Sequence, residues 1–121
     1  MQRLLVAFSN GTYIQPHCHP EQWEMIVPLR DELTLLIFSD DGIVLRRQAL
    51  RHGEVGVAHV PAGAWHTLLT TMPTALMLEA KPGPYRPAQF ALWSPEESHP
   101  QSRAYAARLA EIQEGMPAAF A

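Results

Sequence analysis

The segment from Gly11 to Glu24 reads Gly-Thr-Tyr-Ile-Gln-Pro-His-Cys-His-Pro-Glu-Gln-Trp-Glu. Successive side chains of an extended strand point to opposite faces, so His17 and His19 share one face and Cys18 points the other way. Imidazole is the commonest metal-ligating side chain, and a turn after His19 can bring the Glu24 carboxylate back towards it. Two imidazoles and a carboxylate are the donors of open iron, manganese and zinc sites. The segment therefore predicts a metal site inside a small β-barrel, with Cys18 as a buried structural thiol.

Length and composition place the chain among ordinary globular proteins. It has 121 residues, of which 47% are apolar and 17% are charged, and this length predicts one domain. The formal net charge is −3 and the basic residues are scattered, so binding to nucleic acid is not expected. The single cysteine excludes an internal disulfide. The chain has neither a recognisable signal pattern nor an apolar run near the ~20 residues of a membrane span, so we expect a cytoplasmic protein with no membrane contact.

Short apolar runs separated by turn residues fill the first two thirds of the chain. They lie at residues 4–8, 23–29, 33–38, 43–50, 55–60, 65–71 and 74–81. Short strands at this spacing, with no helical period between them, indicate an antiparallel sandwich or barrel. The predicted fold class is mainly β.

The run from Leu33 to Phe38 is apolar on both faces of a strand. A half-exposed strand would alternate with polar residues, so this strand is expected to be covered on both sides. The outer cover is either a second subunit, which predicts a homodimer, or the N-terminal strand or C-terminal helix.

The chain changes character after Lys81, where prolines interrupt any further strand. Ser98 and Gln101 resemble a capping box at the start of a helix. An apolar stripe at helical spacing follows, formed by Tyr105, Leu109 and Ile112. We expect this helix to pack on the barrel and to carry no chemistry.

Two spaced patterns resemble the motifs of the cupin superfamily. The first cupin motif is Gly-X5-His-X-His-X4-Glu-X6-Gly, and the chain matches it with Asp31 in place of the final glycine. Asp tolerates a left-handed turn conformation better than most residues, so this departure is expected to be benign. The second motif, Gly-X5-Pro-X-Gly-X2-His-X3-Asn, is similar to a pattern from Gly56 to Thr70 that includes His66. This pattern is one residue short after Gly56, and Thr70 replaces the asparagine.

A closer resemblance is to the WbuC family of cupin-fold metalloproteins, and it covers most of residues 11–94. The segments that carry it are His17–Glu24, Val27–Arg30, Asp40–Gly42, Pro61–Leu68 and Glu79–Tyr85. The resemblance implies a double-stranded β-helix, or jelly-roll barrel, with a bound metal. It also implies a link to the assembly of bacterial surface polysaccharide or lipopolysaccharide, but no particular reaction. We expect the barrel to span residues 1–94, with the metal site within 11–70, and a helical appendage to span 95–121.

The candidate metal ligands are His17, His19, Glu24 and His66. Three neutral imidazoles and one carboxylate suit a single divalent transition metal, which could be Fe, Mn, Co, Ni or Zn. Four protein ligands on an octahedral ion leave two positions for water or substrate.

Further residues are candidates for the lining of the same cavity: Tyr13, Gln15, Leu68, Lys81 and Tyr85. Tyr13 and Gln15 share the parity of the histidines, provided that Pro16 leaves the strand undisturbed. Glu79 shares a face with Lys81, and that face is either the lumen or solvent. If the face is inward, Glu79 is the candidate general base, because a partly dry cavity raises the pKa of a carboxyl group.

The function that these residues favour is a metal-dependent enzyme or accessory factor acting on a sugar or sugar-derived acid in polysaccharide assembly. An isomerase or epimerase would use the metal to polarise a carbonyl and a nearby carboxylate to move a proton. One alternative is a non-catalytic module that binds or senses a carbohydrate or another small ligand. Another is an Fe(II)-dependent oxygenase. Cupins host many functions, so the fold cannot choose among them.

Overall fold

A computed structural model describes residues 1–120; Ala121, the last residue of the predicted appendage, lies outside them. The strands are β1 (Gln2–Ser9), β2 (His17–Cys18), β3 (Glu24–Arg30), β4 (Glu32–Phe38), β5 (Val44–Arg51), β6 (Ala58–Val60), β7 (Trp65–Leu69), β8 (Thr74–Lys81) and β9 (Gln89–Phe90). The described residues also form one helix, α1 (Ser102–Glu111), which is not long and apolar enough to cross a membrane.

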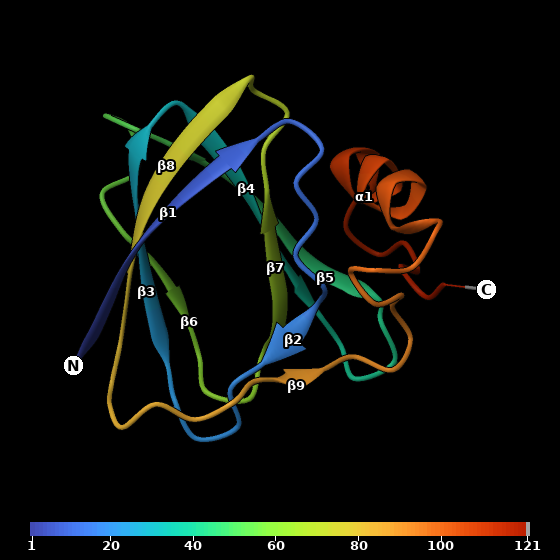
Figure 1. Cartoon of the computed structure of the whole chain (residues 1–121), viewed down its shortest axis with the longest axis horizontal. Helices are drawn as coiled ribbons and strands as arrows, with labels where there is room; N and C mark the ends of the chain where they lie inside the picture. The colour runs from blue at the N-terminus through green and yellow to red at the C-terminus, as the bar shows by residue number, and fades with distance from the viewer. Residues whose placement is uncertain (121) are drawn as a thin grey trace.

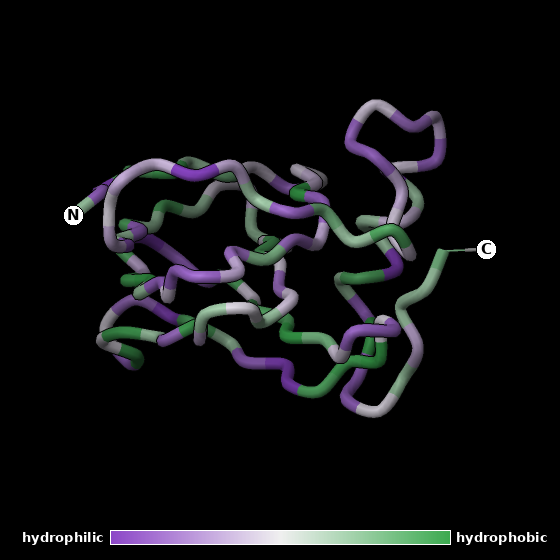
Figure 2. The backbone as a smooth tube through the Cα atoms, turned by 90° about the horizontal axis from the view of Figure 1, so that it is seen from below, coloured by the Kyte–Doolittle hydropathy of each residue, from purple (hydrophilic) through white to green (hydrophobic). Residues whose placement is uncertain are grey.

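The strands form two antiparallel sheets that enclose a common core (Figure 1). One sheet has the order β1-β8-β3-β6, and the other has the order β5-β4-β7-β2-β9. Hydrophobic and hydrophilic residues alternate over short distances along the barrel, as Figure 2 shows, because successive side chains of a strand face opposite ways. Buried side chains from both sheets meet in the interior, among them Phe8, Ile26, Leu33, Leu35, Leu50, Leu68 and Met77.

Strand β4 is buried on both faces, as its sequence predicts. Leu33 and Leu35 face the interior between the sheets. Leu36 and Phe38 face the other way and pack against α1. The outer cover is therefore the C-terminal helix, so this strand gives no support to the predicted homodimer.

Helix α1 begins later than the sequence suggests. Its N-cap is Gln101 and no side chain caps it, so the predicted capping box with Ser98 is wrong. The apolar stripe is confirmed, since Tyr105, Leu109 and Ile112 are all buried against the sheet. Arg47 of β5 fixes the far end of the helix by donating to the carbonyl oxygens of residues 109, 110 and 112, at 3.2, 2.7 and 2.9 Å. A cation there also suits the negative end of the helix dipole.

Two local departures from regular strand geometry agree with the sequence. Strand β3 shifts register against β8 between Pro28 and Arg30, because proline cannot donate a ladder hydrogen bond. Asp31 adopts a left-handed φ of 58° in the turn to β4, which is the conformation that the missing motif glycine would supply.

Strand β8 runs from Thr74 to Lys81, as predicted.

We predict that shortening a buried side chain of α1 destabilises the fold. Leu109 is 1% exposed, so Leu109→Ala should lower the free energy of unfolding by about 2–5 kcal/mol through lost burial and a cavity. Leu45→Ala is the matched control: Leu45 is 59% exposed on β5, and the expected change is within about 0.5 kcal/mol. Urea denaturation measures both. Equal effects would show that α1 contributes little to stability.

Candidate metal centre

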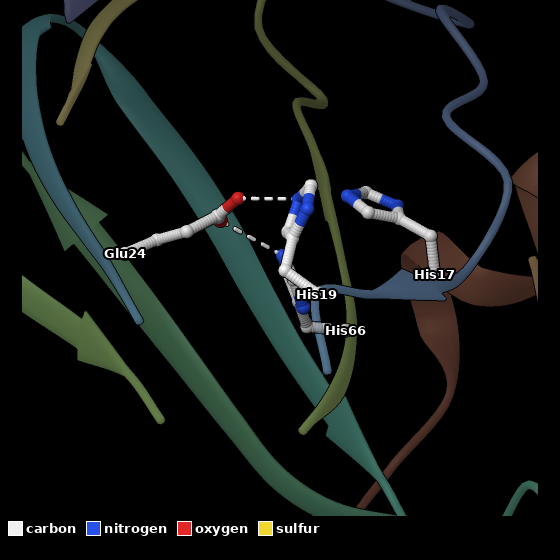
Figure 3. Close-up of side chains that lie close together, drawn as sticks. All are labelled: His17, His19, Glu24 and His66. Atoms are coloured by element: carbon white, nitrogen blue, oxygen red, sulfur yellow. Dashed lines mark hydrogen bonds and ion pairs between the residues drawn. The ribbon is translucent and has the colours of Figure 1, made fainter. Parts of the chain in front are cut away.

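Four side chains from two distant segments converge inside the barrel. His17, His19, Glu24 and His66 each offer a ligand atom, and these atoms lie within 4.8 Å of one another. The two sheets approach the site from opposite sides. Figure 3 shows Glu24 extending from β3 towards the three imidazoles, which come from β2, the residue after it, and β7. The cluster could hold one metal ion. Cys18 is buried and does not belong to it.

Backbone pairing brings the two motifs together. His17 lies opposite His66 where β2 pairs with β7. The turn before β7 is tied to the segment after β2, because the amide of Gly63 donates to the carbonyl oxygen of His19 at 2.9 Å. Gly63 has a φ of 78°, a left-handed conformation that glycine adopts without strain. The Pro-X-Gly pattern of the second motif thus positions both histidine segments.

Hydrogen bonds to the backbone orient two of the imidazoles. Nδ1 of His17 lies 2.8 Å from the carbonyl oxygen of Gln15, and Nδ1 of His66 lies 2.9 Å from that of Ala64. A carbonyl oxygen only accepts, so each Nδ1 carries the proton and donates. The Nε2 atom of a neutral ring is then left with a lone pair. This is the tautomer that a metal-binding histidine needs, held by the kind of contact that accompanies such ligands.

The buried carboxylate of Glu24 has close neighbours but incomplete hydrogen bonding. Its Oε2 lies 3.0 Å from Nε2 of His66, and its Oε1 lies 2.7 Å from Nε2 of His19. Oε1 nevertheless has no hydrogen-bond partner, and neither has Nδ1 of His19. Glu24 is 0% exposed, and a buried charge without compensation is costly. Two ligands bound about 2.1 Å from one ion at right angles lie ~3 Å apart, so these separations and this donor set fit a shared metal ion.

Burial favours the neutral form of His17 and His19, which is the form that binds metals. Burial, followed by the nearby His66, lowers the pKa of His17 from 6.5 to about 4. Burial is also the largest cause that lowers the pKa of His19. Burial alone would raise the pKa of Glu24, but the neighbouring His66 outweighs this effect and holds that pKa below its usual range. At neutral pH the site therefore presents the Glu24 carboxylate and neutral rings at His17 and His19.

The cluster opens onto a cavity of about 260 Å³ whose wall includes Glu79 and Lys81. Both side chains face inward from β8, with 13% and 10% of their surface exposed. Nζ of Lys81 lies 3.5 Å from the Glu24 carboxylate and 4.0 Å from that of Glu79. Burial and then the Glu24 carboxylate raise the pKa of Glu79 to about 7. A carboxyl group with this pKa can both accept and release a proton near neutral pH.

Three residues expected to line the cavity lie elsewhere. Strand β2 is only two residues long and begins after Pro16, so the parity of the histidines does not extend back along the chain. The Tyr13 hydroxyl donates to the carbonyl oxygen of Pro95, and the ring contacts Tyr105. Gln15 donates to the hydroxyl of Ser94. Tyr85 is 74% exposed.

The remaining lining comes mostly from residues that the sequence pattern did not identify. Leu68 lies on the wall, as expected from its parity with His66. Other lining residues are Val6, Ile14, Met77, Ala88, Phe90 and Glu97. Phe90 reaches the mouth because β9 pairs with β2 and sets it opposite His17. Glu97 follows the barrel strands, in a segment to which we assigned no chemistry. Met77 shares the strand face of Glu79 and Lys81, but no local sequence signal marks the other positions, since pairing of distant strands brings them to the site.

Sequence comparison gives a match over less than half of the chain. Residues 1–50 match the model of a family described as a domain of unknown function, DUF6016. No curated protein matches the chain.

Several solved structures are similar to the chain at low sequence identity. A 3,4-ketoisomerase from Helicobacter canadensis is 12% identical, with a TM-score of 0.59, over 70% of this chain and 62% of that one. A TDP-quinovose 3,4-ketoisomerase from Campylobacter jejuni is 11% identical, with a TM-score of 0.61, over 74% and 68%. A recombinant oxalate oxidase in complex with glycolate is 19% identical, with a TM-score of 0.63, over 92% and 56%. The chain thus spans about two thirds or less of each structure.

These similarities confirm the predicted fold class. The chain is a mainly β protein with the double-stranded β-helix fold of the cupins and a short C-terminal helix. Identity below 20% in each named structure supports the fold and not a shared activity.

The stability of the metal-free protein is predicted to depend on pH through His17 and Glu79 in opposite directions. His17 gains its proton near pH 6.5 when unfolded but near pH 4 when folded, so acidification between these values destabilises the fold. Glu79 gains its proton near pH 4.5 when unfolded but near pH 7 when folded, so acidification stabilises the fold. When the pH falls from 6.5 to 4.5, the free energy of unfolding of the Glu79→Gln variant should therefore fall by about 2 kcal/mol more than that of the native chain.

Urea denaturation of chelator-treated protein at the two pH values measures this difference. In the double variant His17→Asn/Glu79→Gln, the free energy of unfolding should fall on acidification by about 2 kcal/mol less than in Glu79→Gln alone, because the asparagine side chain has no proton to gain. Identical pH dependence in the native chain and Glu79→Gln would contradict a raised pKa at Glu79.

Proposed function

We propose that this protein is a metal-binding cupin that catalyses proton transfer on a small sugar-derived molecule, as an isomerase or epimerase does. One observation carries the proposal: the histidine cluster and Glu79 share one cavity. Groups that could hold a metal and a group that can move a proton therefore face the same bound molecule. The cavity of about 260 Å³ is of a size for a single sugar ring or a small acid rather than a polymer.

The proposed metal ligands are His17, His19, Glu24 and His66, and the ion is a divalent transition metal. A bound ion would supply Lewis acidity, which polarises a carbonyl oxygen and makes the neighbouring C–H bond more acidic. The protein would supply the rest. Its imidazoles and Glu24 would hold the ion, and the apolar side chains of Leu68 and Met77 would exclude water.

Glu79 is the proposed general base, and Lys81 is proposed to hold it in position. A base works best when its pKa lies near the working pH, and the pKa of Glu79 is raised to about 7. Lys81 lies between Glu79 and Glu24 and opposes the repulsion between their carboxylates. It therefore keeps Glu79 in the lumen when that side chain is ionised.

The pathway that we propose is the assembly of bacterial surface polysaccharide. Two features support it: the WbuC-like segments of the sequence, and the fold similarity to an isomerase that acts on TDP-quinovose. We also propose a cytoplasmic location for the protein.

Glu79→Gln is predicted to slow exchange of substrate C–H protons with solvent. The amide keeps the shape but cannot accept the proton, so the rate should fall by about 10²–10⁴-fold. Incubation with TDP-linked 4-ketosugars in D₂O, followed by mass spectrometry, measures deuterium uptake. Glu54→Gln, a change at an exposed carboxylate, is the control and should exchange at the native rate.

Other outcomes of that assay distinguish the alternatives. Unchanged exchange in Glu79→Gln at equal metal content would remove Glu79 as the base. Oxygen consumption with Fe(II) that is lost with Zn(II) would indicate an oxygenase. Saturable binding without turnover by the native chain would indicate a binding or sensing module.

Metal content tests the proposed ligand set separately from activity. Freshly purified protein should contain about one transition-metal ion per chain, and His66→Ala should lower the affinity at least ~10-fold, since loss of an outer-sphere partner alone costs that much. His59→Ala changes an exposed histidine outside the cluster and should retain the native content. Full metal content in His66→Ala would remove His66 from the ligand set.

A further inference from the structure

The cavity beside the histidine cluster contains a buried cation whose hydrogen bonds are not made by the residues around it. Lys81 is the last residue of β8, and 10% of its side-chain surface is exposed. Its Nζ lies 3.5 Å from Oε1 of Glu24, but that oxygen has no hydrogen-bond partner in residues 1–120. The distance from Nζ to the Glu79 carboxylate is 4.0 Å, which is beyond hydrogen-bonding range. The ammonium group therefore faces the cavity with its three N–H donors available to a bound molecule.

The surroundings of this ammonium group are poor in other polar partners. Among the described residues that line the cavity, Lys81 is the only lysine or arginine. The apolar part of the wall is formed by Val6, Ile14, Leu68 and Met77. A buried charge without hydrogen bonds is costly, so a ligand that accepts hydrogen bonds from Lys81 would be favoured over an apolar one.

The charges of the cavity favour an anionic ligand. Given the metal site and reaction proposed above, on which this inference rests, a bound divalent ion would bring two positive charges and Lys81 a third. Glu24 contributes one negative charge and Glu79 contributes at most one. The metal-loaded site would therefore carry excess positive charge whichever form Glu79 takes. Excess charge in a partly dry site requires a counter-charge, which the substrate would supply.

We propose that the substrate of this cavity is a sugar acid and that Lys81 binds its carboxylate group. A neutral sugar would leave the ammonium group of Lys81 without an anionic partner. A phosphate group is a poorer fit, because phosphates are held by several donors together, such as arginine side chains or the backbone amides of a helix N-terminus. A single ammonium group matches the single negative charge of a carboxylate.

The position of Glu97 sets the orientation of the sugar acid. Glu97 is exposed and lines the same cavity, and its Oε1 accepts a hydrogen bond of 3.4 Å from the backbone amide of Gln15. A carboxylate accepts hydrogen bonds from hydroxyl groups but repels another carboxylate. The sugar acid would therefore place its carboxylate at the buried Lys81 and its hydroxyl groups near Glu97. A nucleotide attached to the sugar would lie outside the mouth, so free and nucleotide-linked sugar acids both suit this orientation.

Isothermal titration calorimetry of protein loaded with one Zn(II) per chain tests the proposal. The ligands are D-glucuronate, D-galacturonate and the amides of the same two sugars, which differ from the acids only in the charged group. The native chain should bind at least one of the acids about 10-fold or more tightly than its amide, because a hydrogen bond to a charged group is stronger than one to a neutral group. UDP-glucuronate is a further ligand, and tighter binding of it than of glucuronate would support a nucleotide-linked acid.

Two variants separate a binding role of Lys81 from a structural one. Glu79→Gln should keep the preference for the acid, since Lys81 is unchanged. Glu79→Gln/Lys81→Met should lower that preference about 10-fold and leave the affinity for the amide nearly unchanged, because only the acid loses its ionic partner. Both variants avoid an ionised Glu79 without Lys81 beside it. Circular dichroism and metal analysis confirm that each variant is folded and loaded.

Arg86→Gln is the matched control, since it also removes one positive charge. The Arg86 side chain is 58% exposed and pairs with Glu21. It lines a neighbouring cavity that also touches His19, and it does not line the cavity of Lys81. This variant should keep the native preference for the acid. Loss of the preference in Arg86→Gln would overturn the assignment to Lys81 and place the carboxylate in the neighbouring cavity.

Other results would also overturn the proposal. Equal loss of affinity for acid and amide in Glu79→Gln/Lys81→Met would show that Lys81 acts only on the structure. Failure of the native chain to bind either acid would remove the sugar acid as the substrate class. Tighter binding of glucose 6-phosphate than of both acids would assign the cavity to a phosphate.

Deuterium uptake separates this proposal from the proposed reaction. A preference for the acid without deuterium uptake from any sugar would retain the sugar-acid site and remove the isomerase. Uptake from the 4-ketosugars without a preference for the acid would retain the isomerase and remove the sugar-acid site.

Discussion

The burial of one carboxylate among three imidazoles is the constraint on which the rest of this structure depends. Glu24 is fully buried, and one of its oxygens lies 2.7 Å from a histidine nitrogen without a hydrogen bond. An anion in that position needs positive charge beside it, and Nζ of Lys81, 3.5 Å away, supplies only part of it. A divalent ion supplies more charge than a protonated histidine, and the lowered pKa values of His17 and His19 make protonation of those rings unfavourable. The arrangement is therefore best understood as a ligand set.

Several features far from the cluster serve to hold it. Pairing of the two-residue strand β2 with β7 sets His17 against His66. Backbone carbonyl oxygens fix the rings, and the left-handed Gly63 ties the two loops together. The C-terminal helix covers β4 and thereby supports the sheet that carries β7. The second wall of the lumen is β8, which supplies Glu79 and Lys81 inside and an aliphatic surface outside.

The sequence predicted well the features that depend on local spacing. The spacing of the motif residues predicted the histidine and glutamate cluster, and an apolar run predicted β8. The turn that the missing glycine would make predicted the conformation of Asp31. Both faces of β4 were correctly expected to be buried, but spacing could not tell a helix from a second subunit as the cover. The expectation that Tyr13 and Gln15 share the face of the histidines was wrong. The strand begins after Pro16, so the alternation of faces does not extend to residues before it. Phe90 and Glu97 could not be found, since only the pairing of distant segments brings them to the cavity.

X-ray absorption spectroscopy of the metal-loaded protein tests the central claim most directly, because it reports the atoms bound to the ion. The spectrum should contain the outer-shell scattering of three imidazole rings together with a carboxylate oxygen, and His17→Ala should remove the contribution of one ring. A spectrum of oxygen ligands alone, like that of a hydrated ion, would contradict the account.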